Sequence, residues 1–408
     1  MTTALVVGMG VTGQAVARRL RHDGVDVMAY DDAAGDVLPD FLDVDLVVPS
    51  PGVPPSHPVY DLARRSGVPV VSEIELAFRS ATMPLVAVTG TNGKTTVTTM
   101  VAAMLVESGM TAVAAGNIGL PLIEAVAQPV DVVVAEVSSF QLQYTDSFRP
   151  RVAVWLNFAE DHLDWHPSMA EYASAKARVF NAEVAIANAD DPVVMRYAPD
   201  GAVTFGAVGE WTVRRGMLLA PGGVELLPVD ALPRALPHDV ANSLAASAAA
   251  VAAGASLDAC RAVLRSFAGL PHRVQLVSDA GGVRWYDDSK ATTPASVVAA
   301  LQGFESAVLI AGGRNKGLDL GALRAGADRV KSVVAIGDAA AEVEAAFAGV
   351  RRVVRAGSMA EAVDAAGAAA EPGDVVLLSP GCASFDWYSS YAERGDDFAR
   401  LVKERVDR

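Results

Sequence analysis

The chain has 408 residues, of which 51% are apolar and 20% charged, so it is long enough for two or three globular domains. Its formal net charge of −15 argues against a nucleic-acid binder, because phosphate backbones are held by clustered Lys and Arg. Cys260 and Cys382, the only two cysteines, lack the spacing of a metal site and are interpreted as reduced thiols. The sequence has no leader-like stretch and no apolar segment long enough for a membrane span, so we expect a cytoplasmic protein without membrane insertion.

Strand and helix signals alternate over the first 80 residues. Apolar β-branched runs predict strands, and amphipathic stretches between them predict helices. In chain order these segments are 3–7, 11–24, 25–32, 45–54 and 59–67. Alternation of this kind predicts a parallel sheet with helices on its faces.

Two further units of the same type follow. The strand at 85–90 and the helix at 94–108, which is stopped by Gly109, open the second unit after Met83 and Pro84. The stretch 211–228 has the turn residues of a small antiparallel excursion. Further strands are predicted at 131–136, 151–157, 307–313, 332–337 and 374–381.

The junctions at Met83-Pro84 and Gly269-Pro271 divide the chain into three α/β domains. Their predicted limits are 1–83, 84–269 and 270–408. The fold class is therefore α/β with mostly parallel sheets.

The segment TGTNGKTT lies between a predicted strand and a predicted helix, as a phosphate-binding loop does. The usual pattern has a glycine where Val88 stands, but Val88 falls on the strand, where no glycine is needed. In such a loop, backbone N–H groups and the helix N-terminus hold phosphates, the lysine reaches the terminal ones and the hydroxyl ligates magnesium. An ordinary glycine-rich connection is the alternative. The predicted ATP-binding residues of the loop are Gly90, Thr91, Asn92, Gly93, Lys94, Thr95 and Thr96.

Three residues beyond the loop are candidates for the same chemistry. Glu136 ends an apolar strand, where a carboxylate beside a phosphate loop is a plausible magnesium ligand. His162 lies in an acidic loop after a strand and could be a ligand or a surface residue. Lys176, on a predicted helix, is by its pattern alone a solvated charge.

The N-terminus carries a second nucleotide signal. Gly8, Gly10 and Gly13 follow a strand and open a helix, and Asp31 and Asp32 end the next strand, as in a dinucleotide fingerprint. A nicotinamide-dependent dehydrogenase is therefore one hypothesis. The segment is short for a complete dinucleotide fold, however, and could hold one nucleotide diphosphate. Two nucleotide-type sites favour an ATP-consuming enzyme that grips a nucleotide-linked substrate.

The chain resembles the Mur ligases, the amide-forming enzymes of bacterial peptidoglycan synthesis, over nearly its whole length. The short N-terminal segment, with GMGVTG and SPGVP, is most similar to the D-glutamate-adding members. The motifs that carry the resemblance are TGTNGKT at 89–95, GNIG at 116–119, EVSSFQ at 136–141, EDH at 160–162, LPHR at 270–273, DDSKAT at 287–292, GGRNKG at 312–317 and SPGCASFD at 379–386.

The resemblance implies a Rossmann-like N-terminal domain for a UDP-linked substrate, a central ATPase domain of phosphate-loop type, and a Rossmann-like C-terminal domain for the amino acid. It implies that ATP phosphorylates the carboxylate of UDP-N-acetylmuramoyl-L-alanine and that the amine of D-glutamate attacks the acyl phosphate. Two magnesium ions, a lysine at Lys176 carbamylated by carbon dioxide, and a monomeric enzyme are also implied.

Site residues follow from the same resemblance. Catalytic roles fall on Lys94, Glu136, His162 and Lys176, and magnesium ligation on Thr95, Glu136, His162 and Lys176 as carbamate. Contacts to the UDP-linked substrate are expected from Val11, Thr12, Gly52, Asn117, Ser138 and Gln141. Further ATP contacts fall on Asn242, Arg273 and Asp288, and D-glutamate contacts on Lys290, Thr292, Lys316, Ser384 and Tyr391.

Three positions depart from the family pattern. Asp239 stands where the family has Asn, Asn315 replaces an acid of the glutamate motif, and Asp32-Ala33 replaces a Thr-Arg pair near uracil. One adenine contact and the uracil contacts are therefore open. Another amide ligase of the superfamily, such as a folylpolyglutamate synthase, and a binding protein with an inactive ATP site are the remaining alternatives.

Overall fold

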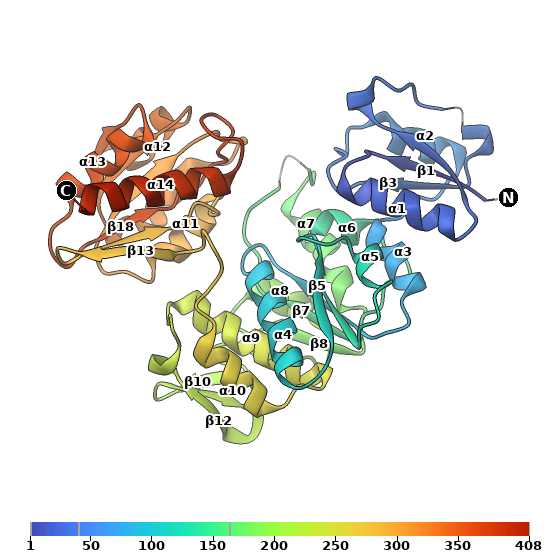
Figure 1. Ribbon diagram of the computed structural model, residues 1–408, viewed down its shortest axis with the longest axis horizontal. Helices are drawn as coiled ribbons and strands as arrows, with labels where there is room; N and C mark the ends of the chain where they lie inside the picture. Colours follow the sequence, from blue (N-terminus) through green and yellow to red (C-terminus); the bar gives the residue numbers. More distant parts are fainter. Residues whose placement is uncertain (1, 40, 163–164, 408) are drawn as a thin grey trace. The chain divides into compact units, whose positions relative to one another are not determined.

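The computed structural model describes residues 2–39, 41–162 and 165–407 of the chain. These residues form two compact units (Figure 1). The first consists of Met1–Phe158, Trp165–Pro233 and Ala241–Phe267, and the second of Ala159–Asp164, Arg234–Val240 and Ala268–Arg408. In the described ranges no helix is long and apolar enough to cross a membrane.

The first unit begins with a three-stranded parallel sheet of order β2-β1-β3. This is the predicted alternation of strands and helices. Its strands are β1 (Thr3–Val7), β2 (Asp26–Tyr30) and β3 (Leu46–Pro49). Its helical segments are α1 (Val11–His22), η1 (Asp32–Ala34), η2 (Phe41–Asp43), α2 (Pro58–Ser66) and α3 (Glu73–Ser80).

A six-stranded sheet of order β5-β6-β4-β7-β8-β9 follows, and all its strands are parallel. The strand order reverses at β4, so the loop after β4 opens at the switch point where open α/β sheets bind ligands. The strands are β4 (Leu85–Thr89), β5 (Ala112–Gly116), β6 (Val132–Glu136), β7 (Val152–Trp155), β8 (Val184–Asn188) and β9 (Val203–Phe205). The helices are α4 (Lys94–Glu107), α5 (Leu122–Ala125), α6 (Ser139–Gln143), α7 (Met169–Ala177), η3 (Arg178–Phe180) and α8 (Pro192–Tyr197).

The predicted antiparallel excursion is confirmed as a small sheet of order β10-β11-β12. Its strands are β10 (Thr212–Arg214), β11 (Met217–Ala220) and β12 (Val224–Pro228), with short turns η4 (Pro221–Gly223) and η5 (Val229–Ala231). Two helices then follow, α9 (Pro237–Ala253) and α10 (Leu257–Ser266). Helix α9 is alanine-rich and mostly buried.

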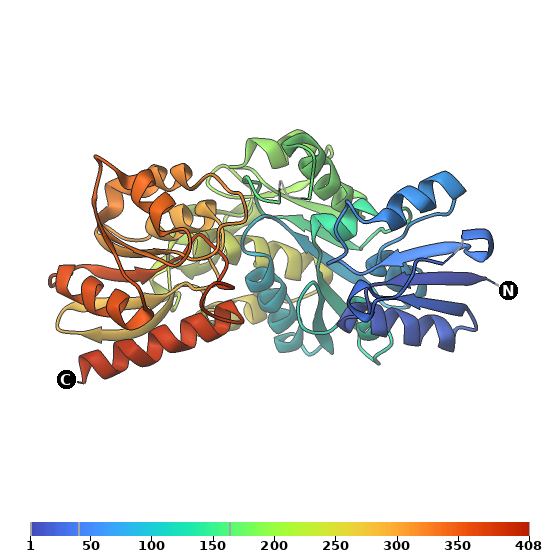
Figure 2. The same cartoon turned by 90° about the horizontal axis from the view of Figure 1, so that it is seen from above.

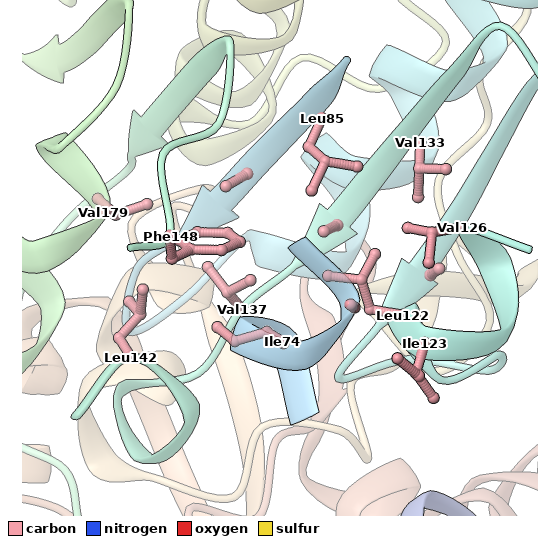
Figure 3. Packing of buried hydrophobic residues seen from close by; sticks show 14 of the residues in the cluster. Ile74, Leu85, Leu122, Ile123, Val126, Val133, Val137, Leu142, Phe148 and Val179 are labelled. Carbon is pink, nitrogen blue, oxygen red and sulfur yellow. The ribbon is translucent and has the colours of Figure 1, made fainter. Parts of the chain in front are cut away.

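One hydrophobic core joins the first two sheets. It runs from Val6 on β1 and Val16 on α1 to Phe148 and Trp155 around the six-stranded sheet. Figure 3 shows Ile74, Leu122 and Ile123 gathered beside Leu85 and Val133. This shared core explains why the two sheets fall in one compact unit, and the division into domains at Met83 stays a prediction.

The second unit contains a six-stranded sheet of order β13-β14-β18-β15-β16-β17, parallel except for the β13–β14 pair. Helices α11 and α12 cover one face, and α13 and α14 cover the other (Figures 1 and 2). The strands are β13 (Gln275–Ala280), β14 (Val283–Asp287), β15 (Ala307–Gly312), β16 (Val330–Ile336), β17 (Arg352–Arg355) and β18 (Val375–Leu378). The helices are α11 (Pro294–Leu301), η6 (Leu320–Arg329), α12 (Ala340–Phe347), α13 (Met359–Ala369) and α14 (Tyr391–Val406).

Candidate active site

The loop between β4 and α4 has the backbone of a phosphate loop. Gly93, with a φ of 83°, turns the chain into α4, whose first residue is Lys94. A Cβ at Gly93 would lie 2.6 Å from Oδ1 of Asn242 on α9, so a side chain at position 93 would displace the Asn242 amide. The predicted loop residue Gly93 and the predicted ATP residue Asn242 are therefore neighbours in space.

The Lys94 side chain folds back over this loop. Its Nζ donates to the carbonyl oxygens of Gly90 and Thr91, each at 2.9 Å. The ammonium group is thus held within the loop itself, at the N-terminus of α4. That end of a helix favours anions, so Lys94 lies where phosphates would bind.

Asn157, which follows β7, fixes the other side of the loop. Its Oδ1 accepts from the backbone N–H of Asn92 at 2.9 Å, and its Nδ2 donates to the Asn92 carbonyl at 3.1 Å. Its own carbonyl accepts from Thr91 N–H at 3.1 Å. The sequence reasoning missed this residue. The available signal was an amide side chain at the end of the strand next to β4.

Glu136 links the loop to the segment after β5. Its carboxylate is 3% exposed; Oε2 accepts from the Thr95 hydroxyl at 2.7 Å, and Oε1 accepts from Nδ2 of Asn117 at 2.9 Å. The structure therefore brings together the predicted residues Thr95, Glu136 and Asn117. A hydroxyl and a carboxylate side by side at a phosphate loop are the oxygen ligands that magnesium prefers, so this pair fits the ion.

Lys176 is not a solvated charge, because its side chain is buried on α7. Its Nζ donates to the Gly90 carbonyl at 2.9 Å and lies 4.8 Å from the centre of the Tyr172 ring. Gly90 thus accepts from two ammonium groups, Lys94 and Lys176. The structure places Lys176 beside the loop between β4 and α4, and its role as a carbamate stays a prediction.

His162 belongs to the second unit. It has a φ of 56°, and its Nε2 lies 3.4 Å from Oδ2 of Asp161. Among the described residues, no three His, Cys, Asp or Glu side chains form a group that could hold a metal ion. The role of His162 as a ligand stays a prediction.

A cavity of about 600 Å³ lies between the N-terminal sheet and the segment after β5. Five of the six residues predicted to contact the UDP-linked substrate line it: Val11, Thr12, Gly52, Asn117 and Gln141. Ser138 is not among the lining residues but holds Gln141. The Asp31 carboxylate accepts from Met9 N–H at 2.6 Å, and Asp32 contacts His57 and the Tyr30 hydroxyl, so both fingerprint acids have partners within the protein.

The amide group of Gln141 is bound at both ends. Its Oε1 accepts from the Ser138 N–H and hydroxyl, each at 3.0 Å, and its side chain also hydrogen-bonds Glu73. Glu73 is 2% exposed and accepts from Ile123 N–H at 2.6 Å. Burial raises the pKa of the Glu73 carboxyl to about 7. Glu73 is a second residue that the sequence reasoning missed; its signal was an acid inside an apolar helix face.

In the second unit, the predicted ATP residues Arg273 and Asp288 lie close together. Asp288 Oδ1 accepts from the N–H of Val274, the residue after Arg273, at 3.2 Å. Its other oxygen accepts from the Ser379 hydroxyl at 2.7 Å. Burial raises the pKa of the Asp288 carboxyl to about 7.

Two of the predicted D-glutamate residues are in contact. Nζ of Lys290 lies 3.7 Å from the centre of the Tyr391 ring. Nζ of Lys316 lies 5.8 Å from the ring centre of Phe385, which is 57% exposed and follows the buried Ser384. Thr292 is partly buried at the end of the segment that carries Lys290.

Arg394 on α14 ties these loops together and was also missed. Its guanidinium is 1% exposed and donates to the Ser289 hydroxyl and carbonyl at 2.9 and 2.8 Å. It also donates to the carbonyls of Cys382 and Ala383 at 3.2 Å. Because Ser289 precedes Lys290 and Ala383 precedes Ser384, Arg394 fixes both segments. No periodicity distinguishes such a buried arginine from a surface one.

Comparison with known proteins defines the class. The Mur ligase middle domain matches residues 88–250, and the Mur ligase, glutamate ligase domain matches residues 272–382. UDP-N-acetylmuramate–alanine ligase from Thermotoga maritima has the same fold, with a TM-score of 0.63 and 21% identity over 99% of this chain and 100% of that chain. A pseudomurein peptide ligase type C from Methanothermus fervidus gives a TM-score of 0.66 at 18% identity over 100% of both chains. The chain therefore has the fold of a Mur ligase.

Relatives with higher identity define the family more narrowly. The UDP-N-acetylmuramoylalanine–D-glutamate ligase of Geobacter metallireducens is 39% identical over 98% of this chain and 96% of its own length. The protein of the same name from Frankia casuarinae is 43% identical over 98% of this chain and 94% of its own length. This chain belongs to the family of UDP-N-acetylmuramoylalanine–D-glutamate ligases. Membership favours the ligase hypothesis over the dehydrogenase hypothesis.

Proposed function

We propose that this protein is an ATP-dependent ligase that joins D-glutamate to UDP-N-acetylmuramoyl-L-alanine in the synthesis of peptidoglycan precursors. The observation that carries the proposal is the identity of 39–43% over 98% of the chain with relatives that bear the name of this reaction. We further infer that the enzyme acts in the cytoplasm as a monomer on these small-molecule substrates.

The reaction needs an activated carboxylate, because a carboxylate is a poor electrophile. An oxygen of the L-alanyl carboxylate attacks the γ-phosphorus of ATP and ADP leaves, which gives an acyl phosphate. The amine of D-glutamate then attacks the carbonyl carbon and loses a proton, and the tetrahedral intermediate expels phosphate to form the amide. Phosphoryl transfer is accelerated mainly by positioning and charge neutralisation.

The phosphate loop would supply both the positioning and the charge neutralisation. Loop amides and Lys94 would bind the β- and γ-phosphates of ATP; Lys94 would exchange the carbonyls of Gly90 and Thr91 for phosphate oxygens. Thr95 and Glu136 would hold one magnesium ion, and His162 would contribute to a second. When bound, magnesium neutralises phosphate charge during transfer.

Carbamylation of Lys176 is proposed from the resemblance and from the place of this residue beside the loop. Its Nζ donates to the Gly90 carbonyl, which also accepts from Lys94. The neutral amine adds carbon dioxide and loses a proton, which gives an anionic carbamate. The carbamate keeps one N–H for the Gly90 carbonyl and attracts Lys94, and its two oxygens can orient magnesium.

The other predicted residues would bind the substrates. The cavity lined by Val11, Thr12 and Asn117 would take the UDP-linked substrate, and Asn242, Arg273 and Asp288 would contact ATP. Around D-glutamate, cations and hydroxyls would bind its two carboxylates. These residues are Lys290, Thr292, Lys316, Ser384 and Tyr391.

The test is phosphate release from ATP and UDP-N-acetylmuramoyl-L-alanine across a panel of amino acids. We expect release above background with D-glutamate and little with L-glutamate, glycine or meso-diaminopimelate. Equal rates with several amino acids would refute the D-glutamate assignment and leave the ligase class in place. Release with a folate and L-glutamate would favour the folylpolyglutamate synthase alternative.

A further inference from the structure

The turn that carries Arg273 has an unusual backbone. His272 and Val274, on either side of Arg273, have φ values of 58° and 47°. Left-handed backbone is rare for residues other than glycine and rarest for β-branched ones such as valine. Such a turn persists only where its surroundings hold it in place.

Arg234 holds the carbonyl side of this turn. Its Nη1 donates to the carbonyls of Arg273 and Val274, the second at 2.8 Å. The opposite side is held by the Asp288 carboxylate, which accepts from Val274 N–H, and by Asp287, which bonds Nδ1 of His272 at 2.6 Å.

Asp239 in turn fixes Arg234. Its two carboxylate oxygens accept from Nε and Nη2 of Arg234, each at 2.6 Å, in a planar two-point pair. One of them also accepts from Leu236 N–H at 3.2 Å. The side chains of Arg234 and Asp239 are only 17% and 11% exposed, so water competes weakly for these bonds. An asparagine here, as in the family pattern, has one acceptor oxygen and no charge and could not form this pair.

We propose that Asp239 and Arg234 are positioning residues for the nucleotide: together they hold the strained turn 272–274 so that Arg273 is presented to ATP. The inference rests on the proposed function, because it assigns Arg273 to ATP. It also gives a role to the aspartate that replaces the asparagine of the family pattern. The Asp239 carboxylate binds Arg234 instead of contacting adenine.

The experiment compares steady-state ligase kinetics of the wild type with Asp239→Asn, Arg234→Gln and the double variant. We expect each single variant to raise KM for ATP about tenfold and to change KM for D-glutamate less than twofold. Because Asp239 acts through Arg234, the double variant should be no worse than Arg234→Gln. Additive losses in the double variant would overturn the proposal.

Asp374→Asn is the matched control. Asp374 pairs with Lys331 at 2.7 Å, the two side chains are 10% and 31% exposed, and the pair lies at the opposite end of the sheet strands from Asp288. It should lower thermal stability as Asp239→Asn does while leaving KM for ATP unchanged. An equal rise in KM for both variants would reduce the effect to general stability and refute the positioning role.

Hydrogen exchange provides a readout that does not need ligase activity. In Asp239→Asn the amides of residues 273–275 should exchange at least fivefold faster, and in Asp374→Asn they should not. If the wild type is inactive as a ligase but this exchange difference is seen, the proposed function is wrong, whereas Asp239 and Arg234 still hold the turn 272–274. Unchanged exchange in Asp239→Asn would overturn the positioning role whatever the activity.

Discussion

The hydroxyl of Thr95 and the carboxylate of Glu136 are joined by a hydrogen bond of 2.7 Å, although 41 positions separate them in the chain. Thr95 lies in the first turn of α4, and Glu136 ends β6, the strand paired with β4. Parallel pairing brings the two elements to the same edge of the sheet. The contact therefore follows from sheet topology. It places the Thr95 hydroxyl and the Glu136 carboxylate side by side at the phosphate loop.

Glu136→Gln tests whether the Thr95–Glu136 pair binds magnesium. The amide keeps the shape and one acceptor oxygen but removes the charge that favours a divalent cation. We expect the magnesium concentration for half-maximal activity to rise and kcat to fall about 100-fold, as for loss of a charge-stabilising group. A magnesium titration of phosphate release measures both. Asp131→Asn, at the start of the same strand region, should leave both parameters unchanged.

Gly93→Ala tests the fit between the loop and Asn242. The new Cβ would approach Oδ1 of Asn242 to 2.6 Å, and Gly93 has a φ of 83°. Gly109, at the other end of α4, has a similar φ of 86° and nothing within 4 Å of its Cβ position. Gly109→Ala should cost about 1 kcal/mol of unfolding free energy from backbone strain alone, and Gly93→Ala should cost more and weaken ATP binding. Denaturant unfolding and calorimetry with ATP measure the two effects; equal behaviour would contradict the close approach.

Arg394→Lys tests the tie between the D-glutamate segments. Lysine cannot bond the carbonyls of Ser289, Cys382 and Ala383 together, so several buried acceptors lose their partner. We expect the unfolding free energy to fall by about 3 kcal/mol. We also expect the variant to raise KM for D-glutamate more than it raises KM for ATP. Arg400→Lys, on the same helix and 56% exposed, is the control and should be close to neutral. An unchanged KM for D-glutamate would leave Arg394 with a structural role only.

Glu73 predicts a pH dependence of stability. Burial raises the pKa of its carboxyl from 4.5 to about 7, so the folded protein binds this proton more tightly than the unfolded chain does. Its contribution is therefore fully present below pH 4.5 and is lost as pH rises to about 7, by on the order of 3 kcal/mol.

Measuring the unfolding free energy of Glu73→Gln between pH 5 and pH 8 tests whether the Glu73 contribution falls as pH rises. The variant should show a flatter decline of unfolding free energy with pH than the wild type, since Gln does not titrate. The exposed control Glu183→Gln should keep the wild-type slope. The pKa of Asp288 is also raised to about 7, so Asp288 accounts for any fall of unfolding free energy with pH that remains in Glu73→Gln.

Lys176 should carry a carbamate in the active enzyme. Carbon-13 NMR of protein equilibrated with labelled bicarbonate should show one carbamate resonance, and Lys176→Arg, which cannot form it, should lack that signal. The signal should persist in Lys403→Arg, which changes an exposed lysine. An active wild-type sample without the resonance would contradict the assignment.

The sheets could be predicted because their strands are short β-branched runs bounded by glycine and proline, and the phosphate loop because its glycines and Lys94 are local in sequence. Asn157, Glu73 and Arg394 could not be found in this way. Each acts on backbone groups distant in the chain, and its own neighbours in sequence give no periodic or motif signal. The pair of Asp239 with Arg234 was not predicted either, because a sequence pattern does not show which side chain an acid binds.

Eight of the eighteen residues that line the cavity beside the N-terminal sheet are glycines or prolines. Two of these glycines, Gly116 and Gly8, have little room for a side chain. A Cβ at Gly116 would lie 2.3 Å from the Glu136 carbonyl, and one at Gly8 would lie 3.1 Å from Val53. An inhibitor that bonds to the peptide groups of Gly8 and Gly116 would therefore meet positions that mutation can hardly alter without damage to the fold. Resistance through substitutions at these two glycines should be rare.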